Sequence, residues 1–503
     1  MQGEAPAAAR TPVICLGALA SGALYALAFP PAELFPLAWI ALVPLVVALC
    51  RVGPWAGAGL GLVFSLGAGA GLASWLPGTL AAFFQLGWGE AVLYAFGVLL
   101  LCGLPYAAFG ACVAAHGRRP GLPLVVAACW GFCEWLRLAG PIPTPWALLA
   151  YTQAPWLPIV QSADLFGALG LGVLMASVNG SVAAILMRDT RGRRFTPARA
   201  LPFALVLAAW IYGGVRLAQP FGTGDEISVA LVQAAVAPSD RFVPARREAN
   251  LERHLALTRK LAAAPPDLVI WPELSVEFHV DSEPALWQRV EETQRALGSE
   301  LLVGAPHSRY RALVLESTNA ALLVRDGRLV DQHEKVALMP FSETRPALLP
   351  IGRDLFRPGR SLRPLHARAG ALGVLLCSEG LQPELAQRLV AGGAELLANP
   401  SNDDWFASEA ASRHQLAVSV FRAVETRRPW IRPSTRGLSS IVDAHGRILA
   451  LAPYGEPALL EARVRRGHEQ SAYSRLSQRL PGPASGITLA FVFGLAVLRR
   501  RDP

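Results

Sequence analysis

Residues 373–380 read Gly-Val-Leu-Leu-Cys-Ser-Glu-Gly, an apolar run that ends in Cys377 and continues into polar residues. Short apolar runs that stop at a loop are typical of buried strands. Reactive groups in open α/β sheets gather at the carboxyl ends of strands, and a thiolate is a strong nucleophile near neutral pH. The stretch therefore predicts an α/β domain in which Cys377 is a nucleophile; the alternative is a buried, unreactive thiol.

The region around this stretch, from residue 225 to residue 465, alternates short β-rich runs with helical stretches. The runs lie at 227–233, 268–271, 301–304, 320–324, 373–377 and 396–399. Asp326-Gly327 and His445-Gly446 each separate two apolar runs, as the turns of β-hairpins do. This rhythm predicts a layered α/β domain with antiparallel pairs mixed into its sheet.

Two further residues can carry chemistry beside a cysteine nucleophile. Pro272 ends the run 268–271, and the next residue, Glu273, can act as a general base. Lys335 leaves the first hairpin and can stabilise an oxyanion, with Glu343 to orient its ammonium group. For Glu273 and Lys335 taken singly, the plainer alternative is a solvated or structural charge.

The amino-terminal part of the chain is too apolar for a soluble domain. The whole sequence is 53% hydrophobic and 17% charged, and its long charge-free stretches lie before residue 220. The segments long enough to cross about 30 Å of hydrocarbon are 11–29, 34–50, 56–75, 90–115, 122–138, 159–187 and 201–217. We therefore expect a transmembrane helical bundle of about seven spans over 1–220, a catalytic domain over 225–465, and a linker with an eighth span at 480–498 over 466–503.

Basic residues indicate the orientation of this bundle. They occur at every second loop, at Arg10, Arg51, Arg118, Arg119, Arg188, Arg191, Arg193, Arg194 and Arg199. The positive-inside rule places these loops in the cytoplasm, so the seventh span exits on the opposite side. The sequence thus predicts an inner-membrane protein whose catalytic domain faces the periplasm. The same clusters account for the net charge of +9, so we expect no nucleic-acid partner.

Some polar and small residues lie within the apolar segments. Glu134 and Arg137, three residues apart, are expected to pair on one helix face or, alternatively, to contact lipid headgroups. Small-residue spacings that would let helices approach closely occur at Gly53/Gly57/Gly61 and Gly67/Gly71.

The cysteines and histidines point to neither a disulfide nor a metal. Six of the seven cysteines lie in or beside apolar segments, so Cys377 has no partner for a disulfide within its domain. His333-Glu334 lacks the second histidine of a His-Glu-x-x-His zinc site. We therefore expect no metal and no other cofactor.

Glu273, Lys335 and Cys377 together carry a family resemblance. Trp271-Pro272-Glu273, then Lys335, then Cys377 with Glu379 resembles the Glu-Lys-Cys constellation of the nitrilase superfamily. Apolar spans before such a domain resemble one branch of it, the apolipoprotein N-acyltransferases. Further blocks similar to that family are 341–343, 401–406, 422–429 and 434–437, and, in the membrane part, 134–137, 145–146 and 161–164.

The resemblance implies a multi-pass α-helical membrane bundle followed by an αββα sandwich, and a ping-pong reaction without cofactors. Glu273 takes the proton of Cys377, the thiolate attacks an ester of a membrane phospholipid, and Lys335 stabilises the oxyanion. The thioester then acylates the N-terminal amine of a diacylated apolipoprotein, and the protein acts as a monomer. Supporting roles are implied for Glu343 and Glu379, and substrate contacts for Phe242, Phe341, Ser378, Asn402 and Trp405.

Four positions differ from the usual family pattern. These are Ser378 in place of tyrosine, Ser342 in place of glycine, Ala337 in place of histidine, and Phe242 near an expected tryptophan. Two other functions stay open at this point. One is a membrane-tethered amidase, in which water replaces the amine; the other is a non-catalytic lipoprotein-binding protein, which the departures beside Cys377 and Lys335 would suit.

Overall fold

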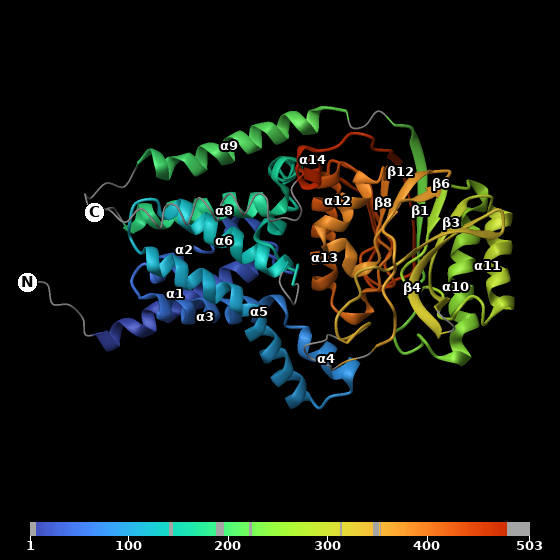
Figure 1. The fold of residues 1–503 in the computed structure, drawn as a ribbon, viewed down its shortest axis with the longest axis horizontal. Helices are drawn as coiled ribbons and strands as arrows, with labels where there is room; N and C mark the ends of the chain where they lie inside the picture. Colours follow the sequence, from blue (N-terminus) through green and yellow to red (C-terminus); the bar gives the residue numbers. More distant parts are fainter. Residues whose placement is uncertain are drawn as a thin grey trace, which may run out of the picture. The chain divides into compact units, whose positions relative to one another are not determined.

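The computed structural model divides the chain into two compact units, residues 1–218 with 479–503, and residues 219–478. It describes residues 7–139, 144–187, 196–220, 224–311, 314–345, 352 and 354–479. The eighth span expected at 480–498 lies outside the described residues. Figure 1 shows the first unit as helices and the second as two sheets with helices.

The first unit is helical. Its longer helices are α1 (Ala7–Leu27), α3 (Pro54–Leu72), α5 (Trp88–His116), α6 (Leu122–Ala139), α8 (Ala163–Met187) and α9 (Pro197–Ala218). Its shorter ones are η1 (Phe35–Trp39), α2 (Val43–Leu49), α4 (Leu76–Phe84), η2 (Leu149–Gln153) and α7 (Leu157–Val160). Within the described residues, four helices, α3, α5, α8 and α9, are long and apolar enough to cross a membrane. They correspond to the segments expected at 56–75, 90–115, 159–187 and 201–217.

The expectation of a continuous span at 34–50 was wrong. This segment forms η1, a turn and then α2, which has seven residues. A helix of that length rises only about 10 Å, so α2 does not cross a bilayer. The segment contains Pro36 and Pro44, which cannot donate helical hydrogen bonds and favour the first turn of a new helix. Hydropathy alone did not reveal this break.

Glycines bring α3 and α5 into close contact, as the spacing of Gly57 and Gly61 predicted. A Cβ atom at Gly61 would lie 2.0 Å from the carbonyl oxygen of Tyr106, and one at Gly110 would lie 2.1 Å from that of Gly57. Gly53, in contrast, has open space around it and takes no part. Without a hydrophobic driving force between helices in lipid, such close backbone packing is a main source of association.

We predict that Gly61→Ala lowers the melting temperature of the protein in detergent, whereas Gly59→Ala does not. Both changes raise helix propensity equally, but Gly59 has open space beside it and Gly61 does not. Overpacking at Gly61 is expected to cost about 1–3 kcal/mol. Thermal unfolding followed by intrinsic fluorescence measures the difference. Equal melting temperatures for the two variants would contradict the packing described for α3 and α5.

Glu134 and Arg137 on α6 do not form the expected pair. The Leu149 N–H donates to Oε1 of Glu134 at 2.6 Å, and the Arg137 guanidinium donates to the carbonyl groups of Thr144, Trp146 and Ala147. Backbone groups of a non-helical segment are costly to leave unpaired in apolar surroundings. Both charged side chains therefore serve the segment after α6 instead of each other.

The second unit contains two six-stranded sheets. One has the order β12-β1-β2-β3-β4-β5 and the other β11-β10-β9-β8-β7-β6. The strands of the first sheet are β1 (Glu226–Gln233), β2 (Leu268–Ile270), β3 (Glu300–Arg311), β4 (Val314–Arg325), β5 (Arg328–Glu334) and β12 (Ala458–Arg465). Those of the second are β6 (Leu365–Ala367), β7 (Gly370–Val374), β8 (Leu396–Ala398), β9 (Trp430–Arg432), β10 (Ser440–Val442) and β11 (Ile448–Leu451).

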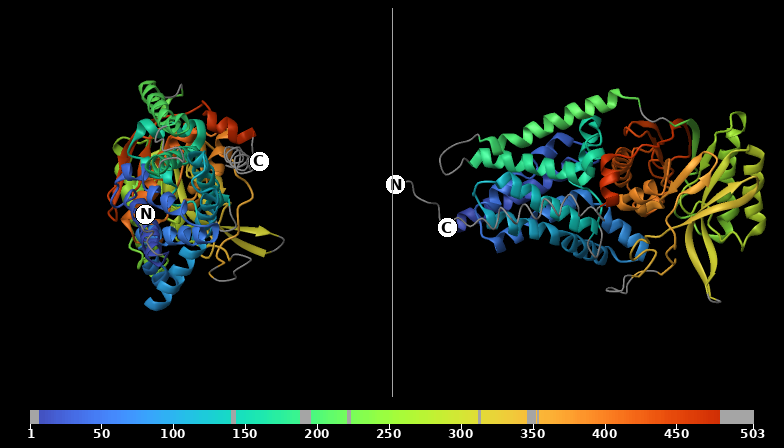
Figure 2. Two further views of the ribbon diagram at one scale, coloured as in Figure 1. Left: turned by 90° about the vertical axis from the view of Figure 1, so that its left-hand side faces the viewer. Right: turned by 45° about the horizontal axis from the view of Figure 1, so that its top comes forward.

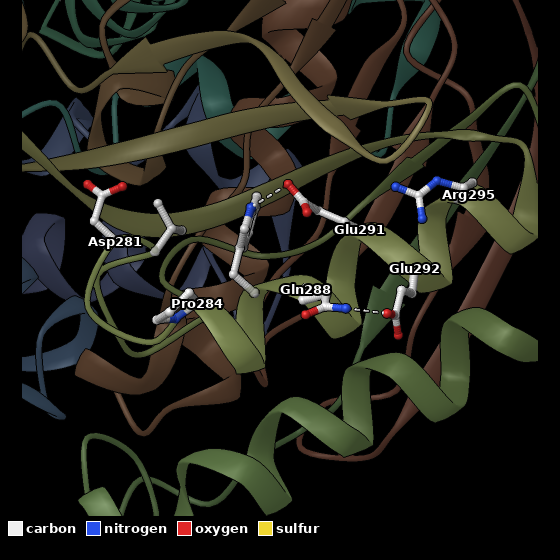
Figure 3. A pocket seen from close by; sticks show the side chains of 8 residues that line it. Asp281, Pro284, Gln288, Glu291, Glu292 and Arg295 are labelled. Carbon is white, nitrogen blue, oxygen red and sulfur yellow. Dashed lines mark hydrogen bonds between the residues drawn. The ribbon is translucent and has the colours of Figure 1, made fainter.

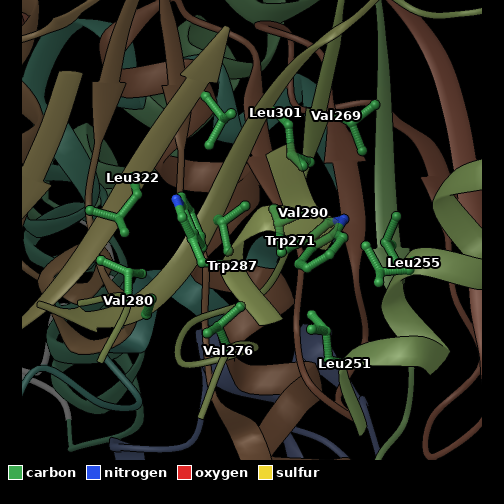
Figure 4. Close-up of a cluster of buried hydrophobic side chains, with 14 of the residues drawn as sticks. Leu251, Leu255, Val269, Trp271, Val276, Val280, Trp287, Val290, Leu301 and Leu322 are labelled. Atoms are coloured by element: carbon green, nitrogen blue, oxygen red, sulfur yellow. The ribbon is translucent and has the colours of Figure 1, made fainter. Parts of the chain in front are cut away.

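Successive side chains on each strand point to opposite faces of the sheet, so each sheet packs against the other sheet on one face and against helices on the other. The unit therefore has four layers. On β1, Val229 and Leu231 pack with residues of the other sheet, such as Val374, in a core between the sheets. Ala230 and Val232 point the other way and pack with helices α10 (Arg247–Arg259) and α11 (Pro284–Leu297), where Trp271 and Trp287 are buried (Figure 4). Helices α12 (Pro383–Ala391) and α13 (Glu409–Thr426) cover the second sheet (Figure 1). The αββα sandwich is thereby confirmed.

The sequence located the apolar parts of the strands and missed polar extensions. Strands are present at all six expected runs, and the turns at Asp326-Gly327 and His445-Gly446 join β4 to β5 and β10 to β11. However, β3 and β4 have twelve residues each and extend well beyond the predicted 301–304 and 320–324. Their extensions carry residues such as His307, Arg309 and Glu316, so they lack an apolar face; Figure 2 shows the hairpin projecting from its sheet.

Candidate active site

Cys377 lies where the sequence placed it, after β7 and at the first residue of the 3₁₀ helix η5 (Cys377–Leu381). Its φ of +49° is unusual for a residue with a side chain and costs on the order of 1 kcal/mol. Neighbouring groups hold this conformation: the Cys377 N–H donates to the Pro400 carbonyl at 2.8 Å, and Nδ2 of Asn399 donates to the Leu375 and Cys377 carbonyls. The turn aims the thiol toward the Asn402 carbonyl, 3.9 Å from Sγ.

Lys335 follows β5 and lies between two buried carboxylates. Its Nζ is 2.9 Å from Oε1 of Glu273 and 2.9 Å from Oε2 of Glu343. Nδ2 of Asn319 donates to both carboxylates, at 2.8 Å each, and the Lys335 N–H donates to the Asn319 carbonyl. The structure thus brings Glu273, Lys335 and Glu343 together and adds Asn319, and Cys377 lies near enough for the charges of Glu273 and Lys335 to act on its thiol. Asn319 directly precedes the apolar run 320–324, and only its burial marks it, because buried amides need partners.

The burial of this cluster sets its protonation. Burial raises the pKa of Glu273 above its ordinary value, against the opposing effect of Lys335. Burial opposes the charge of Lys335, but Glu273 and Glu343 outweigh it and hold the lysine pKa well above its ordinary value. Burial, together with the charge of Glu273, raises the pKa of the Cys377 thiol. The resting site therefore contains an ammonium group and a neutral thiol, and the thiol needs a base to react.

Glu379 ties the strand end before Cys377 to the segment after Lys335. Its carboxylate accepts the N–H groups of Leu376, Val336 and Ala337 at 2.7–3.0 Å and lies 3.2 Å from Nε2 of His333. Burial would raise its pKa, but His333, the Leu376 N–H group and the charge of Lys335 lower it, so the group stays ionised. Glu379 fixes backbone and does not contact Lys335 by hydrogen bond. Sequence reasoning considered His333 only for a metal and missed this contact.

The other expected substrate contacts lie on loops around this cluster. Ser378 follows the nucleophile, and its buried hydroxyl has no hydrogen-bond partner among the described residues. Oδ1 of Asn402 accepts the Asp404 N–H and the Thr435 hydroxyl, so this side chain caps the 3₁₀ helix η6 (Asp403–Trp405).

Three aromatic residues complete the set expected from the sequence. Trp405 ends η6 and is half-buried, and Phe341 is half-buried with a φ of +70°. Phe242 is 53% exposed and has a φ of +59°. Contact of these three rings with a substrate stays a prediction.

A surface hollow on the outer helical layer is separate from this cluster. It is lined by Val280, Asp281, Pro284, Trp287, Gln288, Glu291, Glu292 and Arg295, mostly from α11 (Figure 3). Two pairs of its polar groups are hydrogen-bonded, since Trp287 donates to Glu291 and Gln288 donates to Glu292. It contains none of the residues that the sequence singled out. Within the described parts of the chain, no cluster of His, Cys, Asp or Glu has the arrangement of a metal site.

Comparison with known proteins gives matches for both units. Residues 21–181 match the apolipoprotein N-acyltransferase N-terminal domain, and residues 228–473 match the carbon-nitrogen hydrolase family. The apolipoprotein N-acyltransferase of Geobacter metallireducens is 34% identical over 92% of this chain and 91% of its own length. That of Bordetella bronchiseptica is 29% identical over 75% and 73%. A carbon-nitrogen hydrolase structure from Helicobacter pylori G27 aligns with 55% of this chain and 99% of its own, at 18% identity and a TM-score of 0.38.

Proposed function

Because the chain belongs to the apolipoprotein N-acyltransferase family, we propose that it acylates the N-terminal amine of apolipoproteins through a thioester on Cys377. The chain is a bacterial membrane protein, and it is an enzyme of the carbon-nitrogen hydrolase superfamily. The acyl donor is a membrane phospholipid, and the acceptor is a diacylated apolipoprotein.

The first half-reaction forms the acyl-enzyme. Glu273 accepts the Cys377 proton, the sulfur bonds to an ester carbonyl carbon of the phospholipid, and the Lys335 ammonium group stabilises the oxyanion. When the carbon–oxygen bond breaks, Glu273 returns the proton to the departing lysophospholipid alcohol. The products are a thioester and a lysophospholipid.

The second half-reaction discharges the thioester. The neutral amine of the apolipoprotein attacks the carbonyl carbon, Lys335 again stabilises the oxyanion, and the carbon–sulfur bond breaks. Glu273 takes a proton from the nitrogen and passes it to the Cys377 sulfur. One ester and one amine have become one alcohol and one amide, which is downhill and needs no nucleotide.

The observation that carries this proposal is the position of Lys335 between two carboxylates. Each carboxylate oxygen lies 2.9 Å from Nζ, and Asn319 links both carboxylates, so the ammonium group is fixed before substrate arrives. Preorganised charge of this kind stabilises a developing oxyanion without reorganisation. Glu273 has a raised pKa, which suits a group that accepts and returns a proton in the same turnover.

The membrane placement is part of the proposal. Arg118 and Arg119 lie between α5 and α6, and a dense basic run precedes α9, so the positive-inside rule assigns these loops to the cytoplasm. Helix α9 then ends on the periplasmic side of the inner membrane, where residue 219 begins the catalytic unit. We further propose that the protein acts as a monomer, because all the residues of the cluster come from one chain.

The test is an intact-mass measurement. The full-length protein is incubated with phospholipid alone, and the expected result is one added acyl group, absent in Cys377→Ala and removed by a diacylated lipopeptide. Release of ammonia from simple amides without an acyl adduct would favour the amidase. Binding of lipopeptide without either reaction would favour the non-catalytic protein.

A further inference from the structure

Arg241 is a buried cation outside the catalytic cluster that contacts two other loops, the one between β2 and α11 and the one that contains η6. Its side chain is 4% exposed. Nη1 is 2.7 Å from Oδ2 of Asp404, Nη2 donates to the Leu274 carbonyl at 2.6 Å, and Nε lies 3.3 Å from Oε1 of Glu277. The planar guanidinium group has five N–H donors in fixed directions, so one residue can bind both loops at once.

Each of these loops carries part of the site. Leu274 directly follows the proposed base Glu273 and is itself in the left-handed region, with a φ of +51°. Asp404 belongs to η6, which is capped by Asn402, the residue whose carbonyl lies against the Cys377 thiol. Arg241 therefore joins the loop of the base to the loop beside the nucleophile.

The loop that contains Arg241 itself presents Phe242. The Phe242 N–H donates to Oε2 of Glu277 at 2.9 Å, and the phenyl ring lies over the Arg241 guanidinium at 4.9 Å. These two contacts hold an exposed aromatic ring on a backbone whose φ of +59° is otherwise unfavourable.

We propose that Arg241 is a positioning residue for the acyl-transfer reaction, which fixes Glu273 and the Asn402 carbonyl relative to Cys377 and holds Phe242 at the surface. The inference rests on the proposed function and goes beyond it, because Arg241 touches no reacting atom. A stabilising role alone explains the arrangement poorly, since replacing a buried ion-pair network by apolar residues is often neutral or stabilising. Two loops held by one planar group, one beside the base and one beside the nucleophile, are what precise alignment of the two requires.

The primary test compares Arg241→Lys with Arg428→Lys in the full-length protein. Lysine keeps the positive charge of arginine but lacks the planar, forked arrangement of N–H donors. Arg428 is a matched control, because it is also a buried arginine, 3% exposed, that donates to backbone carbonyls such as that of Ala394. Ala394 precedes β8, at the opposite end of that strand from Asn399. We expect Arg241→Lys to slow acyl-enzyme formation by about 100-fold, as misplacement of a reacting group by about 1 Å does, and Arg428→Lys to change it less than twofold.

A double variant tests the route of the effect. If Arg241 acts through the loop of Asp404, the rate loss of Arg241→Lys/Asp404→Asn equals that of the more impaired single variant instead of the product of both losses. Multiplying losses would overturn that part of the inference.

A second readout separates this inference from the proposed function. Alkylation of Cys377 by iodoacetamide, followed by peptide mass, needs the thiolate and no lipid, and we expect it to be several-fold slower in Arg241→Lys. If the unaltered protein forms no acyl adduct, the proposed function fails and the alkylation rates decide on Arg241. If neither acylation nor alkylation is slower in Arg241→Lys than in Arg428→Lys, while both melting temperatures fall alike, Arg241 is merely structural.

Discussion

Lys335→Met is expected to abolish acyl-enzyme formation and to destabilise the catalytic unit. Methionine fills the space of the lysine chain but leaves Glu273 and Glu343 buried without their shared cation, which lies 2.9 Å from each. Removing one partner of a buried ion pair costs about 3–5 kcal/mol. Loss of one oxyanion donor typically costs about 10²–10³-fold in rate, and here the stranded carboxylate also stays protonated and ceases to act as a base.

The pH dependence of this destabilisation has a definite sign. In the unaltered protein the pKa of Lys335 is raised, so its stabilising contribution is complete below the unfolded-state pKa, near 10.5, and is lost only as pH rises through the folded-state value. In Lys335→Met, burial disfavours the ionised form of Glu273, whose pKa is raised already in the unaltered protein, so the deficit grows as pH rises through the pKa of Glu273 and shrinks in acid. Melting temperatures of both proteins between pH 5 and pH 9 measure this difference.

The sequence offers a matched control for Lys335. Lysine occurs at only two positions in this chain, 260 and 335, although Lys and Arg together number 46. Lys260 is exposed, and we expect Lys260→Met to leave the adduct and the melting temperature unchanged. If Lys335→Met were as active and stable as Lys260→Met, neither the buried ion pairs nor the oxyanion role would stand. The presence of lysine instead of arginine at 335, in a chain so rich in arginine, was itself a signal for a specific role. A compact ammonium group fits between two carboxylates where a guanidinium would not.

The sequence predicted those features that depend on local pattern. Apolar runs ending at Pro272 and Cys377 predicted the strands and therefore which end of the sheets carries the cluster. The break between η1 and α2 was not predictable from hydropathy, since both pieces are apolar. Contacts between polar residues far apart in the chain could not be predicted from local sequence pattern either.

Arg241, Asn319 and His333 illustrate this limit. In the sequence each is an ordinary polar residue. Its structural role comes from a hydrogen bond to a partner 36 to 163 residues away, such as Glu277, Glu273, Glu379 or Asp404. Only burial distinguishes such residues from solvated ones, because a buried polar group must be paired. Ser378, one of the four departures from the family pattern, shows the opposite case. Its place in the structure is defined, but no contact explains why this residue is serine.

Glu273→Gln is the second change expected to have a large effect, and it separates proton transfer from charge placement. Glutamine can keep the acceptor oxygen for Lys335 and Asn319, which bond to Oε1 of Glu273 in the unaltered protein. The melting temperature should therefore fall less than in Lys335→Met. Acyl-enzyme formation should still slow by about 10²–10⁴-fold, the usual contribution of a general base.

The pH profile of this variant decides the role of Glu273. The pKa of Glu273 is raised, so the carboxylate that accepts the thiol proton is lost as pH falls through that value. Acyl-enzyme formation by the unaltered protein should accordingly decline on the acid side. In Glu273→Gln the level region above that value disappears, and the residual rate should rise about tenfold per pH unit over the whole range, because only the thiolate fraction of Cys377, whose own pKa is raised, then reacts. Rates of adduct formation between pH 5 and pH 9 give both profiles. An unchanged profile in Glu273→Gln would mean that another group takes the proton, and the ion pair with Lys335 would then be the whole contribution of Glu273.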